Sequence, residues 1–512
     1  MYRLTYSKQS RINITISIII ALLTIVSSTL ADNPWEQKHK LLATDGQFGN
    51  NLGESIAIDG ELCAVGAPYA TNSQGTMTGA VYVFNVITGK QIVKLLPDDG
   101  QHQDLFGRSL AISGNLAVVG SMRRAQFNDN AGSIYFFDVT TGQQLMKIYP
   151  ADNMESDYFG GSITIDGNRV VAGASGHTGN NSRSGAVYIF DATTGQQISE
   201  IFATNNGPGA GVGGSVAIDG NTIAAGAIGE DAHGLDSGSA YLFDANTGQQ
   251  LFKLLPQDGA ERDRFGNSID IQGNLVLVGA YMDDDNGTDS GSAYLFDAAT
   301  GQQLAKLLPD DGQSSDQFGF SVALNGNFAF IGSLFGDGAV SNSGAVYVFD
   351  VSTGQQVTKL IAPDGKQNDF YGNAVSVNNN CVAIGAKLDD DVDTDAGAAY
   401  IVQQRTTNLL DITPNPLIAG QNGHFIVNKA NPNQNTWLVY SINGTGGFFS
   451  RDLNVVIDLQ NPQLAAGPKR TNVDGNLLWG ILIPGYSANT SIWFQSVQFS
   501  NKTNVIATQI VP

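Results

Sequence analysis

One sequence unit recurs seven times along the chain at a spacing of 53 residues. Each copy contains the segment Gly-[Ala/Ser]-x-Tyr, whose tyrosines are Tyr82, Tyr135, Tyr188, Tyr241, Tyr294, Tyr347 and Tyr400. A glycine that closes an apolar run keeps the same register, at Gly66, Gly120, Gly173, Gly226, Gly279, Gly332 and Gly385. A third glycine follows an aromatic residue in most copies, as in Phe265-Gly266. Repeats of this length build solenoids, propellers or arrays, in which each unit packs on its neighbours.

Each unit is predicted to contain four β-strands. In the fifth copy these strands cover residues 268–271, 275–278, 292–296 and 303–308. Dipeptides such as Asp166-Gly167 favour a tight hairpin between the first two strands. The second strand is apolar without alternation, which indicates a sheet buried on both faces. Four-stranded sheets packed between identical neighbours are propeller blades. The sequence therefore predicts an all-β fold, with a seven-bladed β-propeller over residues 34–404.

The paired segments Phe-Gly and Gly-Ala resemble the FG-GAP repeat, which forms the propeller blades of integrin α-subunits and of many secreted bacterial proteins. This resemblance implies a propeller that binds extracellular partners. Integrin-type blades carry a D-x-D-x-D-G calcium loop between the two segments, whereas here that place holds a short hairpin, as at Asp166-Gly167. Integrin calcium sites therefore cannot be transferred to this chain, whose short hairpins resemble the bacterial subtype of the repeat.

The two ends of the repeat region are predicted to close the ring together. Lys40-Leu41-Leu42 repeats the ending of the fourth strand, seen at Lys306-Leu307-Leu308, but it precedes the first copy. The seventh copy lacks a fourth strand after Tyr400. We therefore expect Lys40–Leu42 to pair with the strand that holds Tyr400, which would cover an exposed sheet edge.

Residues 1–31 have the pattern of a secretory signal peptide. A basic start is followed by an apolar run from Ile14 to Val26 and by a Thr29-x-Ala31 cleavage pattern. An uncleaved membrane anchor is the alternative, but the run is short for a membrane span. We expect a chain that is secreted, periplasmic or attached to the cell surface after cleavage, with no membrane span left in the mature protein. The formal net charge of −21 argues against a nucleic-acid partner.

Residues 406–512 are predicted to form a second domain, because the 53-residue rhythm ends near Thr406. Six strand-like runs follow, separated by Gly, Asn and Pro, at 425–427, 437–441, 455–459, 477–483, 492–499 and 505–511. So many short strands in about 100 residues indicate an immunoglobulin-like β-sandwich. Trp437, Trp479 and Trp493 lie on these strands, where we expect core packing; a platform for carbohydrate stacking is the alternative.

Several repeated or isolated residues receive structural interpretations. The seven tyrosines are expected to fill equivalent pockets between blades. The turn Asp244-Ala245-Asn246-Thr247-Gly248 resembles turns of pyrroloquinoline-quinone dehydrogenases, but this chain lacks their tryptophan in each blade and their adjacent cysteine pair. Its five histidines are expected to be exposed loop residues. Cys63 and Cys381 are expected to be buried free thiols, because facing sheets lie ~10 Å apart and a disulfide needs Cα atoms ~5.5 Å apart.

The loops between the second and third strands differ between copies, and two of them are rich in aspartate. The candidate metal ligands are Asp283, Asp285 and Asp289 in the fifth copy and Asp389, Asp391, Asp393 and Asp395 in the seventh. Alternating carboxylates in a glycine-rich loop can surround Ca²⁺ with oxygens; solvated acidic decoration is the alternative. In a four-stranded meander these loops and the connections between blades emerge on one face, which is therefore expected to be acidic.

The expected function is that of a secreted, non-enzymatic binding or adhesion module. Its acidic loop face would bind an extracellular protein or glycan, with calcium as a candidate cofactor. One alternative is an extracellular glycan hydrolase or lyase with its site at the mouth of the propeller. Another is a structural component of a surface or matrix. No G-x-S-x-G or H-E-x-x-H motif supports an enzyme.

Overall fold

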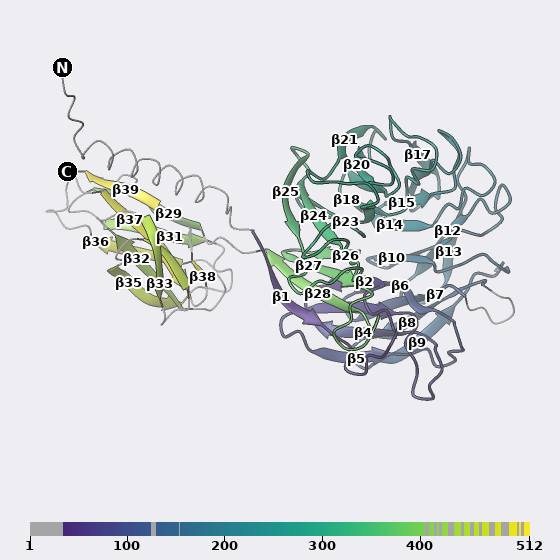
Figure 1. Ribbon diagram of the computed structural model, residues 1–512, viewed down its shortest axis with the longest axis horizontal. Coiled ribbons are helices and arrows are strands. Elements are labelled where there is room, and N and C mark those ends of the chain that lie inside the picture. The colour runs from purple at the N-terminus through teal and green to yellow at the C-terminus, as the bar shows by residue number, and fades with distance from the viewer. Residues whose placement is uncertain are drawn as a thin grey trace, which may run out of the picture. The chain divides into compact units, whose positions relative to one another are not determined.

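The structure is a computed structural model that describes residues 34–123, 130–152 and 154–404 and, beyond these, the backbone of the strands between residues 409 and 511. The chain separates into two compact units after Gln404. In the first unit, the described regular elements are all β-strands, and they form seven sheets of four strands each (Figure 1). This arrangement is the predicted seven-bladed propeller.

Six blades use four strands that are consecutive in the chain and lie in chain order across the sheet. The first three are β2 (Ser55–Asp59), β3 (Leu62–Ala67), β4 (Ala80–Asn85) and β5 (Gln91–Leu95); β6 (Phe106–Ser113), β7 (Leu116–Ser121), β8 (Ser133–Asp138) and β9 (Gln143–Ile148); and β10 (Ser162–Asp166), β11 (Arg169–Ala174), β12 (Ala186–Asp191) and β13 (Gln197–Ile201). The next three are β14 (Ser215–Asp219), β15 (Thr222–Ala227), β16 (Ser239–Asp244) and β17 (Gln250–Leu254); β18 (Ile269–Gln272), β19 (Leu275–Ala280), β20 (Ser292–Asp297) and β21 (Gln303–Leu307); and β22 (Phe318–Asn325), β23 (Phe328–Ser333), β24 (Ala345–Asp350) and β25 (Gln355–Leu360).

The seventh blade joins both ends of the propeller. Its strands β26 (Tyr371–Asn378), β27 (Cys381–Ala386) and β28 (Ala398–Gln404) are completed on the outside by β1 (Trp35–Leu41), which lies beside β28 in Figure 1. The two strands are antiparallel, with Lys40 opposite Tyr400 and Leu41 opposite Ala399. The predicted closure is therefore confirmed.

The innermost strand of each blade contacts the innermost strands of both neighbours, and β26 contacts β2, so the ring is closed. These strands line a central channel of about 380 Å³. In six blades the residue at the middle of the innermost strand is small, and in the fifth blade it is Asp270. The six small residues are Ala57, Ala111, Thr164, Ala217, Ala323 and Ser376. Small side chains are needed where seven strands converge, so Asp270 is the exception.

Close contact between neighbouring blades explains two of the repeated glycines. A Cβ atom added to Gly279 would lie 2.0 Å from the carbonyl oxygen of Gly319 in the next blade. Gly319 itself has a φ of +90°, which strains residues with a side chain. The Ser268 hydroxyl donates to the same carbonyl oxygen at 2.8 Å, and five other blades repeat this bond. Where the ring closes, the Asn373 side chain instead donates to the Gly53 carbonyl at 3.0 Å.

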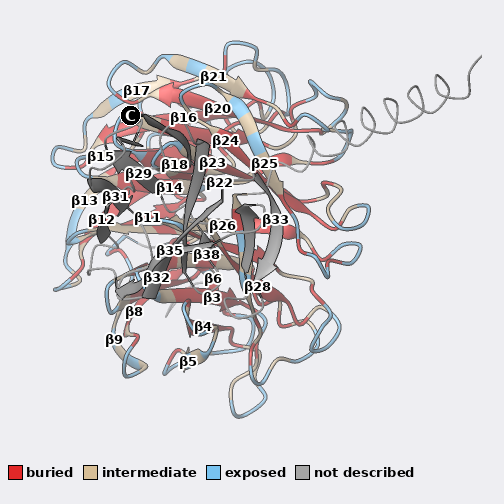
Figure 2. Ribbon diagram, turned by 90° about the vertical axis from the view of Figure 1, so that its left-hand side faces the viewer, coloured by how far each residue is buried: buried red, intermediate tan, exposed pale blue. Residues whose placement is uncertain are grey.

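The repeated tyrosines are fully buried, and their rings belong to apolar clusters that form between neighbouring blades. In the fifth blade the Tyr294 ring contacts the Phe265 ring edge to face, with centroids 5.5 Å apart. The interpretation of these tyrosines as inter-blade packing residues is confirmed. Figure 2 shows the same distribution, with burial in the strands and exposure in the loops.

The repeated turns between third and fourth strands are structural, as expected. In one of them the Thr300 hydroxyl donates to the Asp297 carboxylate at 2.9 Å, and the backbone N–H of Thr300 donates to it at 2.8 Å. Both cysteines are buried free thiols, which confirms their interpretation. Burial raises the pKa of Cys381 to about 11.

The second unit, Arg405–Pro512, is also built from β-strands. Its strands are β29 (Leu409–Thr413), β30 (Leu417–Ile418), β31 (Asn422–Asn428), β32 (Asn435–Ser441), β33 (Thr445–Ser450), β34 (Val455–Leu459), β35 (Gln463–Arg470), β36 (Leu477–Leu482), β37 (Ser491–Gln498), β38 (Asn501–Lys502) and β39 (Ile506–Val511). All six expected runs overlap a strand, whereas β29, β30, β33, β35 and β38 were not predicted. The immunoglobulin-like sandwich and the roles of the three tryptophans stay predictions. The signal-peptide prediction lies outside the described residues.

Candidate functional site

The connections of each blade divide between two faces of the propeller. We call the loop face the one formed by the loops between second and third strands and by the connections between blades. The hairpin face carries the tight hairpins and the Thr-Gly turns. Lys306 on the outer strand β21 shows that both kinds of connection meet on the loop face. Its ammonium contacts Asp258, from a connection between blades, and Asp283, from a loop after a second strand.

A lysine lies over the buried tyrosine ring in six of the seven blades. The distance from lysine Nζ to ring centroid is 4.8–5.5 Å, in the pairs Lys40–Tyr400, Lys94–Tyr82, Lys147–Tyr135, Lys253–Tyr241, Lys306–Tyr294 and Lys359–Tyr347. Carboxylates on the loop face complete each group by pairing with the lysine at 2.7–2.9 Å. We call this arrangement the lysine–tyrosine cluster.

In the fifth blade the acidic loop is part of this cluster. The Lys306 ammonium lies 3.1 Å from the Asp283 carboxylate and 2.6 Å from the Asp285 carboxylate. Asp283 is buried and also accepts a hydrogen bond from the Tyr294 hydroxyl at 2.8 Å. Burial tends to lower the pKa of Lys306, but these carboxylates outweigh it and raise that pKa above its ordinary value. The lysine ammonium therefore occupies the centre of the predicted cation site.

The seventh blade repeats this arrangement with a lysine from the other end of the chain. The Lys40 ammonium on β1 lies 2.7 Å from the Asp389 carboxylate and 2.5 Å from the Asp391 carboxylate. A third carboxylate, that of Asp364, lies 2.8 Å away. Asp389 is buried and accepts a hydrogen bond from the Tyr400 hydroxyl at 3.0 Å. The acidic loop thus also holds the strand that closes the ring.

The remaining predicted metal ligands have other contacts. Asp289 and Asp395 each have a φ of +53°, and their backbone N–H groups donate to carboxylates within their own loops. The Asp393 carboxylate accepts from the backbone N–H of Phe48 at 3.1 Å. The structure therefore brings together two predicted ligands in each loop, and both pairs surround a lysine. Calcium binding there stays a prediction, and it would require the ion to displace that ammonium.

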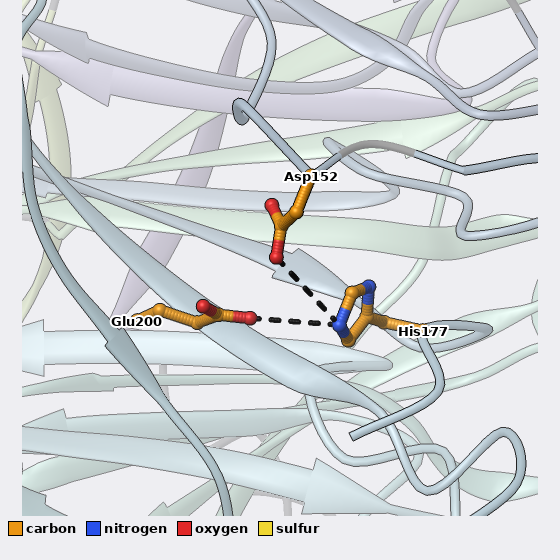
Figure 3. Close-up of side chains that lie close together, drawn as sticks. All are labelled: Asp152, His177 and Glu200. Atoms are coloured by element: carbon orange, nitrogen blue, oxygen red, sulfur yellow. Dashed lines mark ion pairs between the residues drawn. The ribbon is translucent and has the colours of Figure 1, made fainter.

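The third blade departs from the lysine–tyrosine cluster. Glu200 on β13 occupies the position that holds lysine in the other six blades, beside Tyr188. His177, from the loop after β11, points its Nε2 atom toward this glutamate and toward Asp152 (Figure 3). The Nε2 atom lies 3.5 Å from Glu200 Oε1 and 4.0 Å from Asp152 Oδ2. Among the described residues, these three form the one group of His, Cys, Asp or Glu side chains spaced to hold a metal ion.

Packing and a third carboxylate fix the orientation of the His177 ring. The side chain is buried, with only 4% of the residue exposed, and the ring stacks on Phe202 at a centroid distance of 5.8 Å. Its Nδ1 atom lies 3.0 Å from the carboxylate of Asp157, which is also buried. The hydrogen bond to Asp157 raises the pKa of His177. Burial, together with the neighbouring Asp152 carboxylate, raises the pKa of Glu200.

The expectation that all five histidines are exposed loop residues was wrong for two of them. His177 is buried because Phe202 and Tyr188 enclose its ring. His39 lies on β1, where its Nε2 atom is 3.0 Å from the Ile87 carbonyl oxygen. His102 and His233 are exposed, as expected. His424 has no described side chain.

The mouth of the channel on the loop face, where an enzyme site was considered, is lined by polar residues and by one or two apolar residues from each innermost strand. Glu54 pairs there with Arg108, and its other oxygen lies 3.1 Å from the Lys387 ammonium. Asn267, Phe320 and further residues of the innermost strands complete the lining, which contains no histidine or tyrosine among the described residues.

Comparison with known proteins agrees with this architecture. A search of curated proteins found no match. No helix among the described residues is long and apolar enough to cross a membrane. The family model described as FG-GAP repeat matches seven segments, at residues 35–84, 90–137, 143–190, 196–243, 249–296, 302–349 and 355–402. Each matched segment begins with the outer strand of one blade and continues with three strands of the next, which is the offset that lets β1 close the ring. The chain therefore belongs to the FG-GAP repeat family.

Proposed function

We propose that this chain is a secreted, non-enzymatic binding or adhesion module that engages an extracellular protein or glycan through the loop face of its propeller. The observation that carries this proposal is the difference between the two faces. On the hairpin face the same Asp-x-x-Thr-Gly turn recurs with the same bonds, as at Asp244 and Asp297. On the loop face the loops after the second strands keep nearly the same length but differ in sequence, charge and contacts from blade to blade. Variation on a conserved scaffold is how repeat proteins acquire binding surfaces.

Charge on the loop face favours a partner with a basic surface. In the fifth and seventh blades, three carboxylates surround each lysine, so each cluster keeps an excess of negative charge. Asp98 and Asp310 add exposed carboxylates on connections between blades. Clustered charge of one sign speeds association with an oppositely charged partner and makes that association sensitive to salt.

The proposal is tested by screening the full chain against arrays of extracellular-matrix proteins and glycans. For any ligand captured, association rates are then compared for the double variant Asp98→Lys/Asp310→Lys and for Glu61→Lys, a charge reversal at an exposed residue of the hairpin face. We expect the loop-face variant to slow association about 10-fold at low salt and the hairpin-face variant to change it little. Equal effects of the two variants would contradict the proposed surface, and turnover of a glycan would contradict a non-enzymatic role.

Calcium binding by the acidic loops is a separate proposal, supported by their carboxylate pattern alone. Titration of the full chain with Ca²⁺ tests it, with Asp285→Asn and Asp391→Asn as variants. These two aspartates are more exposed than Asp283 and Asp389, so their replacement should leave the fold intact. Absence of binding heat in the unaltered chain would end this proposal without affecting the binding function.

A further inference from the structure

We propose that the third blade holds a divalent transition-metal site, formed by His177 Nε2 with the Asp152 and Glu200 carboxylates, for an ion of the Zn²⁺ class. This site is distinct from the acidic loops of the fifth and seventh blades. It also does not depend on the ligand of the loop face.

The first argument concerns the missing lysine. In six blades an ammonium group lies over the tyrosine ring and pairs with the surrounding carboxylates. In the third blade Glu200 replaces that lysine, so a negative charge stands where the fold elsewhere has a positive one. Three carboxylates, those of Asp152, Asp157 and Glu200, remain close together. In the described part of the chain their ion pairs are all with His177. A bound cation would supply the positive charge that a lysine ammonium supplies in the other six blades.

The second argument concerns the histidine ring. The Asp157 carboxylate accepts a hydrogen bond at Nδ1, at 3.0 Å, and so places the proton on that nitrogen. The Nε2 lone pair then points at one oxygen of Asp152 and one of Glu200, and the Tyr188 hydroxyl lies beside the same two oxygens, at 3.5 Å and 3.1 Å. A carboxylate that orients a histidine through its far nitrogen is the usual support of a histidine metal ligand. The Tyr188 hydroxyl completes this support, since it lies 3.1 Å from Glu200 Oε1.

The third argument concerns distances. A tetrahedral ion with bonds near 2.0–2.1 Å holds its ligand atoms roughly 3.3 Å apart. The separation of Nε2 and Glu200 Oε1 is 3.5 Å, close to this value, and that of Nε2 and Asp152 Oδ2 is 4.0 Å. Asp152 is the most exposed of the three, with 45% of its side chain accessible, so it can close this gap and also gives the ion access from solvent. Three protein ligands leave a fourth position for water.

The ligand set selects the class of ion. One imidazole with two carboxylates suits Zn²⁺ and neighbouring first-row ions, whereas Ca²⁺ and Mg²⁺ prefer oxygen ligands alone. The same preference distinguishes this site from the loops of the fifth and seventh blades, which offer only oxygens.

The test uses the full chain, purified without a histidine tag, in equilibrium dialysis against Zn²⁺ and in absorption spectroscopy with Co²⁺. We expect one Zn²⁺ per chain and the visible absorption bands of tetrahedral Co²⁺. His177→Gln and Glu200→Lys should each weaken binding by more than about 100-fold, and Asp157→Asn by about 10- to 100-fold through the loss of ring orientation. Glu200→Lys is expected to fold normally, because six blades already carry lysine at this position.

A matched control is Lys147→Glu in the second blade, which places a second carboxylate beside Asp99 and Tyr135 without a histidine. It should add no Zn²⁺ site. Loss of the Co²⁺ bands in Glu200→Lys, with an unchanged melting curve in the absence of metal, would support the proposal. Absence of stoichiometric Zn²⁺ binding, equal binding by Glu200→Lys, or equal affinity for Ca²⁺ would overturn it. None of these results bears on ligand capture by the loop face, so the two proposals fail separately.

Discussion

Replacement of Leu41 by alanine tests whether the closing strand β1 belongs to the cooperative unit of the propeller. Leu41 is completely buried in the apolar cluster between the seventh and first blades, opposite Ala399. Truncation of a buried leucine to alanine removes contacts and leaves a cavity, so we expect a loss of about 3 kcal/mol in the free energy of unfolding. Over roughly 370 residues, an unfolding entropy of about 2.1 cal/mol/K per residue converts this into a fall of about 4 °C in Tm.

Leu95→Ala is the matched control, because Leu95 ends the outer strand of the first blade at the same repeat position and is equally buried. Its strand β5 is joined to its blade through the chain, whereas β1 is held in its blade by non-covalent contacts alone. Thermal and urea unfolding of the full chain, with hydrogen exchange read at Lys40 and Tyr400, would compare the two. Similar losses are expected. A normal loss for Leu95→Ala with little change for Leu41→Ala would show that β1 opens independently, and would refute the closure as a stabilising contact.

Further predictions concern the channel, the blade contacts and the thiols. Burial raises the pKa of Asp270 to about 6 against an ordinary 3.8, so the folded chain binds the extra proton between these values and its stability falls as pH rises through that window. Asp270→Ala should remove the contribution of Asp270 to this dependence, while Asp263 and Asp369, whose pKa values burial also raises to about 6, keep theirs. The stability of the variant relative to the unaltered chain should grow by up to about 3 kcal/mol between pH 4 and pH 7; a constant difference would contradict the shift. Gly279→Ala should lower the free energy of unfolding by more than about 3 kcal/mol, because the new methyl group would meet the backbone of the next blade. Gly273→Ala has open space around it and should cost only about 1 kcal/mol, for its φ of +57°. Comparable losses in urea unfolding would show that the blades can separate. Cys63 and Cys381 should resist alkylation in the folded chain and react on unfolding, and a mass lower by two hydrogens without reductant would mean that they are joined.

Much of the propeller could be predicted from the sequence because every blade repeats the same physical requirements. Gly279 is repeated because a neighbouring carbonyl excludes any side chain there. Tyr294 is repeated because each gap between blades needs the same ring. Seven copies in register leave little freedom, so the strands of the fifth blade begin and end within two residues of the expected positions. In the second domain no repeat supports the prediction, and five strands were missed.

The acidic loops were harder to interpret because a loop sequence does not show which basic group faces it. Asp283 and Asp285 are two residues apart in the sequence, but Lys306, whose ammonium contacts both carboxylates, comes from an outer strand. Asp389 pairs with Lys40, a residue nearly 350 positions away. Carboxylate spacing alone cannot distinguish a loop that binds a cation from one that binds a lysine of its own chain.

The sequence does carry a signal of the group that Asp152, His177 and Glu200 form in the third blade. Lysine follows the repeated tyrosine by 12 residues in five copies, and Glu200 takes that place after Tyr188. The substitution reverses a charge at a position that is otherwise constant. What the sequence could not show is that His177, in a separate loop, turns inward to meet it. A comparison of the seven copies at every repeat position, and not only in their loops, identifies the third blade as the exception.

The pairing of β1 with β28 also determines how the propeller bears tension. Trp35 lies opposite Gln404, so the chain enters and leaves at the same end of an antiparallel pair. A force pulling these two residues apart would load their hydrogen bonds one after another, and the strands would peel apart from that end. A force between a ligand on the loop face and Gln404 would instead run along β28. This strand is hydrogen-bonded to β27 on one side and to β1 on the other, so the force would load both rows of hydrogen bonds together. Mechanical strength should therefore be greatest when the load passes from the loop face into the chain that follows residue 404.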